Sequence, residues 1–117
     1  LKGYKATSHW AWHGQLALFG AEPVKARTVF DRNRVTGGGV TAGIDFALAL
    51  TSEIRGEAHA RLVQLSLEYD PAPHFDSGSP GKVGKALLAT YAERMAHLAP
   101  NREVELKEAA AHLGFTG

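Results

Sequence analysis

The sequence predicts an α/β fold, in which short strands alternate with helices along the chain. Residues 4–7 and the alternating, β-branched residues 24–30 are typical of strands. Longer stretches between and after them place apolar residues at helical spacing, which indicates helices layered against those strands. A length of 117 residues, with 44% apolar and 21% charged residues, is typical of one small globular domain.

The first third of the chain is expected to hold the strands. After the short buried strand at 4–7, the stretch HWAWHGQLALF predicts a helix that ends at Phe19, because Gly20 is a helix-terminating residue. Residues 24–36 predict a β-hairpin with the polar sequence DRNR at its tip. One side of its first strand carries Val24, Ala26, Thr28 and Phe30.

Three glycines at 37–39 precede a helix predicted over residues 41–55. Thr41 is its expected N-cap, and Asp45 lies in the first turn, where the helix dipole favours a carboxylate. Two interpretations of the glycines stay open. They permit close packing of strand against helix, or they leave backbone N–H groups facing an anion, an oxyanion or a thiolate. Their spacing matches neither the P-loop nor the Rossmann pattern.

After a break at Gly56, a further helix is predicted over residues 57–69, and a Pro/Gly/Ser-rich loop follows it at 70–81. The apolar stripe expected to pack this helix consists of Ala58, Leu62, Leu65 and Tyr69.

Two more helices complete the expected elements. Ser79 and Pro80 have the character of an N-cap and a first helical residue. Asn101 caps a last helix that reaches Leu113, with Gly114 beyond it. The apolar face of the first of these helices consists of Val83, Leu87, Tyr91, Met95 and Leu98.

These elements do not complete a layered fold. Residues 42–50, AGIDFALAL, are apolar nearly all round, and such a helix needs cover on several sides. Two or three short strands and the flanking helices offer too little sheet to cover it. The chain also begins at Leu1, and its one methionine is Met95. We therefore expect residues 1–117 to be part of one domain that another segment or polypeptide completes.

Composition limits the function classes. A net charge of +1 gives no reason to expect nucleic acid or an acidic membrane as a partner. The absence of cysteine excludes disulfides and any thiol nucleophile supplied by these residues. No apolar run approaches the roughly 18 residues of a membrane span, so a cytoplasmic location is expected.

The histidines and tryptophans near the start of the chain are a candidate site. His9 and His13 have the spacing of two metal ligands on one helical face, but Trp10 stands where a zincin motif has glutamate. No third ligand is apparent, so no metal site is expected. Trp10 and Trp12 are interpreted as packing residues, with the wall of a pocket as the alternative.

A more specific pattern comes from four consecutive segments: LKGYKATSHW, LALFGAEPV, DRNRVTGGGVTAGIDFALAL and VQLSLEYDPAPHFDSGSP. In this order they resemble the second half of proteins of the ThiJ/PfpI superfamily, which is class I glutamine amidotransferase-like. The subfamily that they resemble most is isocyanide hydratase. The resemblance runs from Leu1 to about Pro80, and residues 81–117 match in helical character alone.

The resemblance implies the C-terminal half of a flavodoxin-like three-layer sandwich, which is usually a homodimer. It also implies a cysteine nucleophile on a sharp strand-to-helix turn, with an acidic partner earlier in the fold. Both precede the segment that matches Leu1, so the chain holds no catalytic residue and needs the N-terminal half of the same domain. The implied reaction adds water to a small-molecule isocyanide and yields an N-substituted formamide, without a cofactor.

By resemblance, His9 lies near the missing cysteine, and the glycine turn forms one wall of the substrate pocket. The residues implied in that wall are Gly38, Gly39, Val40 and Thr41. Two alternatives remain: another ThiJ/PfpI hydrolase or amidotransferase-like enzyme, and the sensory domain of a transcriptional regulator. Residues 82–117 carry five basic and four acidic side chains, a balance that is poor for contacts to DNA phosphates.

Overall fold

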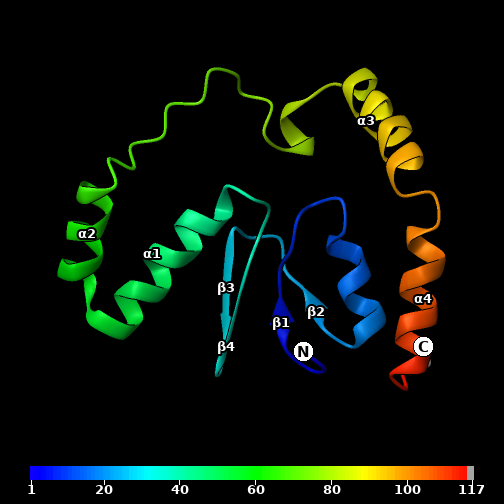
Figure 1. Ribbon diagram of the computed structural model, residues 1–117, viewed down its shortest axis with the longest axis horizontal. Coiled ribbons are helices and arrows are strands. Elements are labelled where there is room, and N and C mark those ends of the chain that lie inside the picture. The colour runs from blue at the N-terminus through cyan, green and yellow to red at the C-terminus, as the bar shows by residue number, and fades with distance from the viewer. Residues whose placement is uncertain (116–117) are drawn as a thin grey trace. The chain divides into compact units, whose positions relative to one another are not determined.

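The first unit of the structure contains both strands and helices, as the sequence predicts, with its strands before its two α-helices (Figure 1). The computed structural model describes residues 1–115, in two units that divide after Ala72. The first unit contains β1 (Lys5–Ala6), the 3₁₀ helix η1 (His13–Phe19), β2 (Glu22–Pro23), β3 (Thr28–Asp31), β4 (Arg34–Gly37), α1 (Ala42–Arg55) and α2 (Glu57–Ser66). The second contains η2 (Pro80–Lys82), α3 (Lys85–Leu98) and α4 (Arg102–His112).

Two short strands, β1 and β2, form a parallel pair that the sequence pattern does not reveal. The Glu22 N–H donates to the Tyr4 carbonyl at 2.8 Å, and the Val24 N–H donates to the Ala6 carbonyl at 2.8 Å. Val24 therefore continues this pairing and does not belong to the hairpin.

The other edge of β1 is occupied by side chains of the hairpin. The Lys5 N–H donates to Asp31 Oδ2 at 2.7 Å, and the Thr7 N–H donates to Thr36 Oγ1 at 3.0 Å. These bonds satisfy backbone donors that in a wider sheet would pair with a further strand.

The predicted hairpin is present, but it spans residues 28–37, with an antiparallel register that pairs Thr28 with Gly37. The prediction of a start at residue 24 is wrong, because the chain turns where the Ala26 N–H donates to the Val24 carbonyl at 3.0 Å. The buried side of β3 is the one that carries Val29, whereas Phe30, on the opposite side, is 48% exposed.

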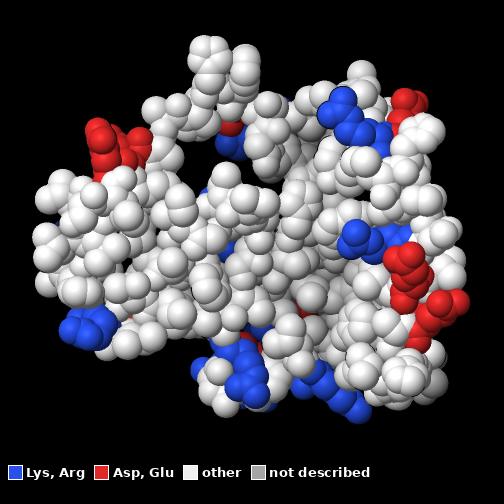
Figure 2. Space-filling view, in the orientation of Figure 1, with Lys and Arg blue, Asp and Glu red and all other residues white. Residues whose placement is uncertain are grey.

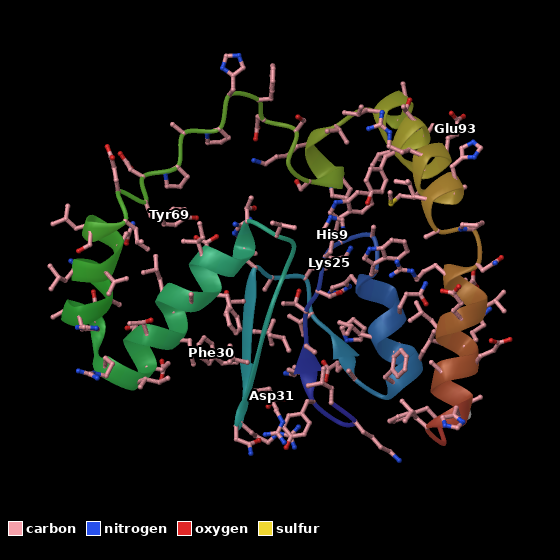
Figure 3. All side chains as sticks on the ribbon, in the orientation of Figure 1. His9, Lys25, Phe30, Asp31, Tyr69 and Glu93 are labelled. Carbon is pink, nitrogen blue, oxygen red and sulfur yellow. The ribbon has the colours of Figure 1, made fainter. Side chains whose placement is uncertain are left out.

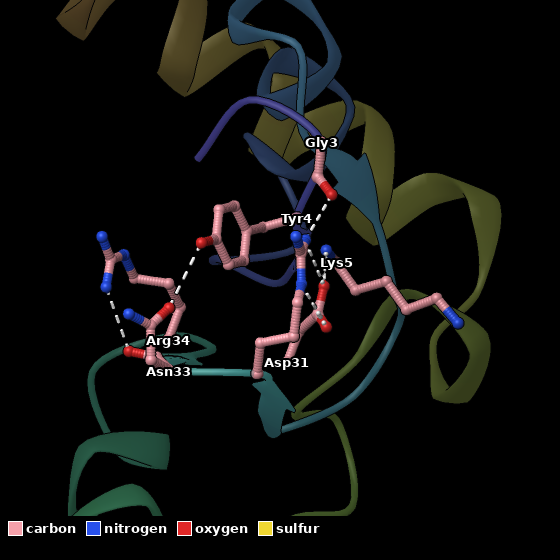
Figure 4. Close-up of polar contacts among 7 residues, drawn as sticks. Gly3, Tyr4, Lys5, Asp31, Asn33 and Arg34 are labelled. Atoms are coloured by element: carbon pink, nitrogen blue, oxygen red, sulfur yellow. Dashed lines mark hydrogen bonds and ion pairs between the residues drawn. The ribbon is translucent and has the colours of Figure 1, made fainter.

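The hairpin tip is held to the start of β1 (Figure 4). Arg32 has a left-handed backbone, with φ of 54°, and its guanidinium stacks 3.7 Å from the centre of the Tyr4 ring. The same guanidinium donates to the Gly3 carbonyl and to the Asp31 carboxylate. The hydrogen bond from Arg32, followed by that from the Lys5 N–H, lowers the pKa of Asp31 below its ordinary value.

The helix predicted through HWAWHGQLALF is a 3₁₀ helix that begins only at His13. His9 lies before it in a turn, where the Trp12 N–H donates to the His9 carbonyl at 3.0 Å. The His9 imidazole takes a backbone donor that a helix would use, because its Nδ1 accepts the Ala11 N–H at 3.2 Å. His9 and His13 therefore do not share one helical face. Gly20 ends the helix in the left-handed region, as predicted.

Helix α1 begins and ends close to the predicted bounds, and Gly56 stops it with φ of 88°. The expected capping bond from Thr41 is absent, since this residue already has a helical backbone, with φ of −73°. Helix α2 ends three residues earlier than predicted. Glu68 adopts a left-handed backbone, with φ of 51°, so Tyr69 lies outside the helix.

Helix α1 is incompletely covered in this structure, in line with the expectation from its sequence. Ile44 is 44% exposed and Ile54 is 68% exposed. The stripe expected on α2 is exposed as well, at Leu62 and Leu65. The buried residues of the first unit are all small: Ala6, Thr7, Ala21, Val29, Ala42 and Ala60.

The second unit begins at Pro73, inside the predicted loop, and continues as helices. Ser79 is extended and makes no capping bond, and Pro80 starts the short helix η2 where a longer helix was predicted. Helix α3 begins only after Gly84. Helix α4 follows Asn101 as predicted, and Gly114 lies beyond it with φ of 79°.

Candidate functional site

The glycine turn packs closely against this chain's own residues. A Cβ at Gly37 would lie 3.2 Å from Phe46 Cδ2, and one at Gly38 would lie 3.3 Å from Ala42 Cβ. Both neighbours belong to α1, so the missing side chains let the end of β4 approach the helix. The three glycines at 37–39 all lie outside the left-handed region, and each has a close neighbour within this chain, so close packing is one physical reason for them.

The third glycine meets the candidate histidine. A Cβ at Gly39 would lie 2.8 Å from His9 Cδ2, a separation that real Cβ atoms do not adopt. His9 is half-buried, and its ring lies 5.5 Å from that of Trp10, centre to centre. Because Nδ1 accepts the Ala11 N–H, Nε2 carries the proton of the neutral ring and is the donor that His9 offers.

The start of α1 provides further donors beside this histidine. The Ala42 N–H donates to the Gly39 carbonyl at 2.9 Å, and the Gly43 N–H donates to the Val40 carbonyl at 3.2 Å. Within residues 1–115, no acceptor meets the N–H groups of Gly39, Val40 and Thr41. Val40 is 96% exposed. Unpaired N–H groups at a helix start favour a negatively charged group nearby.

The structure thus brings together the residues that the sequence singled out. Gly39 contacts His9, and Gly38, Val40 and Thr41 continue the same turn. His9 is labelled in Figure 3. No group of three or more His, Cys, Asp or Glu side chains that could hold a metal ion occurs among the described residues.

Sequence reasoning missed the contacts that brace this turn. Asp45 accepts a hydrogen bond from the Tyr69 hydroxyl at 2.8 Å and one from Arg27 Nε at 2.7 Å. Partial burial raises the pKa of Asp45, but these two bonds and the guanidinium charge lower it by more, so that it lies below its ordinary value. The bond to Asp45 raises the pKa of Tyr69, which is labelled in Figure 3.

The charged surface has no single sign. Figure 2 shows small, separate groups of acidic and basic side chains on an otherwise uncharged face of each unit. None of the described helices has both the length and the apolar content that crossing a bilayer requires.

Comparison with known proteins defines the class. No protein-family model matches the chain. A solved structure, the crystal structure of a ThiJ/PfpI family protein from Pseudomonas syringae, superposes with a TM-score of 0.79 at 45% identity and covers 94% of the chain. The chain belongs to the ThiJ/PfpI family. Among curated proteins it matches the isonitrile hydratase of Pseudomonas putida, with 51% identity over 115 residues.

Both similarities cover nearly all of this chain but only part of the relatives. The match takes in 98% of the chain and 50% of the isonitrile hydratase. The crystal structure is matched over 44% of its own chain. The described residues are therefore a mixed α/β partial domain, which spans about half the length of the proteins that it matches.

Proposed function

We propose that these residues are the C-terminal part of a cysteine-dependent isocyanide hydratase, in which the N-terminal half of the same domain supplies the nucleophile. The observation that carries the proposal is the 51% identity to an isonitrile hydratase over nearly the whole chain. The composition supports it, since a chain without cysteine needs the sulfur from elsewhere. The partially exposed α1 supports a missing layer of the fold.

The proposed chemistry is the addition of water to an isocyanide, which needs no oxidant, reductant or other cofactor. The cysteine thiolate attacks the terminal carbon of the isocyanide R–N≡C, and that carbon gains a proton, which gives a thioimidate, R–N=CH–S–enzyme. Water then adds to the same carbon, and the nitrogen is protonated. The carbon–sulfur bond then breaks as the new hydroxyl loses its proton, which releases the formamide R–NH–CHO and returns the thiolate. The proton lost here balances the one gained when the thioimidate forms.

The role of the described residues is to build one side of the pocket. The unpaired N–H groups of Gly39, Val40 and Thr41 form a partly positive surface, which favours a thiolate over a thiol beside it. His9 Nε2 is a donor that can hold negative charge or the attacking water. Gly38 keeps this turn against α1.

The test is the activity of the complete protein compared with that of residues 1–117 alone. Joined to or coexpressed with the N-terminal half, these residues are expected to convert an alkyl isocyanide to its formamide, followed by the formyl proton in NMR spectra. Iodoacetamide should abolish the activity, and residues 1–117 alone should be inactive. Intact-mass analysis should find one reactive cysteine, and size-exclusion chromatography a homodimer.

Two other outcomes would contradict the proposal. Formamide production by residues 1–117 alone would show that no borrowed cysteine is needed. A complete protein that makes no formamide would instead point to another ThiJ/PfpI hydrolase, and binding of operator DNA would point to a regulator.

A further inference from the structure

Asp45 joins three segments that are far apart in the sequence. Its Oδ1 accepts the Tyr69 hydroxyl at 2.8 Å, and its Oδ2 accepts Arg27 Nε at 2.7 Å and also Arg27 Nη2. Its side chain is 34% exposed, so these bonds are partly shielded from water. Both carboxylate oxygens are thus engaged by side chains from outside α1.

The end of α2 explains how Tyr69 reaches Asp45. Glu68 adopts the left-handed conformation just after the helix, and the Tyr69 N–H donates back to the Gln64 carbonyl at 3.1 Å. This is the pattern of a Schellman C-cap, which turns the chain sharply away from the helix axis. The turn brings the Tyr69 hydroxyl to the first turn of α1, where Asp45 lies.

Arg27 holds both ends of the glycine turn. Its carbonyl accepts the Gly38 N–H at 2.8 Å, which fixes the start of the turn. Its guanidinium binds Asp45, which fixes the helix that the turn leads into. Gly39 lies between these two anchors and is pressed against the His9 ring.

We propose that Asp45 is a positioning residue, which through Arg27 and Tyr69 fixes the N–H groups of Gly39, Val40 and Thr41 relative to His9. It touches neither these N–H groups nor His9 in the structure, so it acts through the two anchors. A carboxylate suits this place better than an amide, because it accepts from both partners at once and its charge matches the guanidinium. The effect on turnover rests on the proposed function, whereas the effect on backbone order does not.

The first experiment asks whether the contact exists in the complete protein. The Tyr69 hydroxyl is titrated by NMR with ring-labelled tyrosine, and its resonance is assigned by its loss in Tyr69→Phe. Asp45→Asn is expected to lower the pKa of Tyr69 toward the ordinary tyrosine value, since the carboxylate no longer holds the phenol proton. An unchanged pKa of Tyr69 would overturn the proposal.

The second experiment asks whether the contact orders the turn. Amide hydrogen exchange at Ala42 and Gly43 is expected to become about tenfold faster in Asp45→Asn and less so in Tyr69→Phe, which removes a single hydroxyl. The matched control is Glu57→Gln, which removes an exposed carboxylate paired with Arg61 within α2. Exchange in this control should stay within about twofold of the wild type.

Kinetics give the third measurement and separate the two proposals. We expect kcat for isocyanide hydration to fall about tenfold in Asp45→Asn while KM changes less than about twofold, since placement of the donors affects the transition state most. A kcat and an exchange rate that both stay at the wild-type values would overturn the positioning role. If the wild type itself makes no formamide, the proposed function fails, and the exchange rates alone decide the role of Asp45.

Discussion

Gly39 and Gly43 lie four residues apart, and the structure predicts opposite responses to an added methyl group. A Cβ at Gly39 would collide with the His9 ring, and nothing lies within 4 Å of a Cβ at Gly43, inside α1. Gly39→Ala should therefore destabilise the complete protein by about 1–3 kcal/mol through overpacking. Gly43→Ala should stabilise it by about 0.5–1 kcal/mol, since alanine favours the helix. Denaturant unfolding measures both values, and equal effects of the two variants would contradict the packing at Gly39.

The carboxylates of Asp31 and Asp45 predict a loss of stability in acid. Both have a pKa below the ordinary value in the folded protein. Their contribution is therefore complete above the pKa of the unfolded side chain, about 4, and is lost as the pH falls through the lower folded value. The free energy of unfolding of the complete protein should fall between about pH 4 and pH 2. The fall should be shallower in Asp45→Asn, and a parallel fall in both proteins would exclude a role for this carboxyl.

At the level of single residues, the sequence predicted the glycine turn better than the side chains that hold this turn in place. Glycines beside a helix start are a local signal, so Gly38 and Gly39 could be singled out as a site of close approach. The contact of Gly39 with His9 depends on where η1 begins, and no periodicity reveals that. Arg27 and Tyr69 carry no local signal either, because their partner Asp45 is brought to them by tertiary packing alone.

At the level of elements, two residues other than glycine adopt the left-handed backbone within residues 1–115. Replacing each of them with glycine is expected to have a different effect on stability. Glu68 ends α2 with an exposed side chain, so Glu68→Gly should stabilise the protein by about 1 kcal/mol through relief of backbone strain. Arg32→Gly gains the same relief but loses the stacking on Tyr4 and the bonds to Asp31 and Gly3. It should therefore stabilise less or destabilise. Thermal unfolding of both variants measures the difference. A larger gain in stability for Arg32→Gly than for Glu68→Gly would contradict a stabilising role for the contacts of Arg32 at the hairpin tip.

The helices were predictable as elements because their signals are local. Gly20, Gly56 and Gly114 end helices where the sequence expected them to. The parallel pairing of β1 and β2 was not predictable, since each strand has two residues and β2 contains Pro23. The early end of α2 was missed because Glu68 is an unusual residue for the conformation that it adopts.

At the level of the whole molecule, the small size of the buried residues predicts weak cooperativity for residues 1–117 alone. Within the described residues, no buried side chain is larger than valine. A chain with so little buried apolar surface should bind the dye ANS and unfold over a broad range of denaturant. Joined to the N-terminal half of the domain, the same residues should lose ANS binding and unfold sharply. A sharp, dye-free transition of residues 1–117 alone would contradict the proposed missing layer.

The α/β class and the family could be predicted because they rest on patterns that survive in a partial sequence. The membership follows from segments such as DRNRVTGGGVTAGIDFALAL, and the structural similarity to a ThiJ/PfpI protein supports it. The three-layer sandwich remains a prediction, because the described residues form two separate two-stranded sheets. A sheet of that kind needs strands that this sequence does not contain.

The outer edges of β1 and β2 also affect the tendency of the protein to associate at high concentration. Asp31 accepts the outward N–H of Lys5 in β1, and Thr36 accepts that of Thr7 just after this strand. Pro23 has no N–H to offer on the outward side of β2. A strand of another chain that approached this pair would therefore find no row of unpaired backbone N–H groups with which to form hydrogen bonds. This two-stranded sheet is therefore protected against open-ended pairing with further copies of the chain.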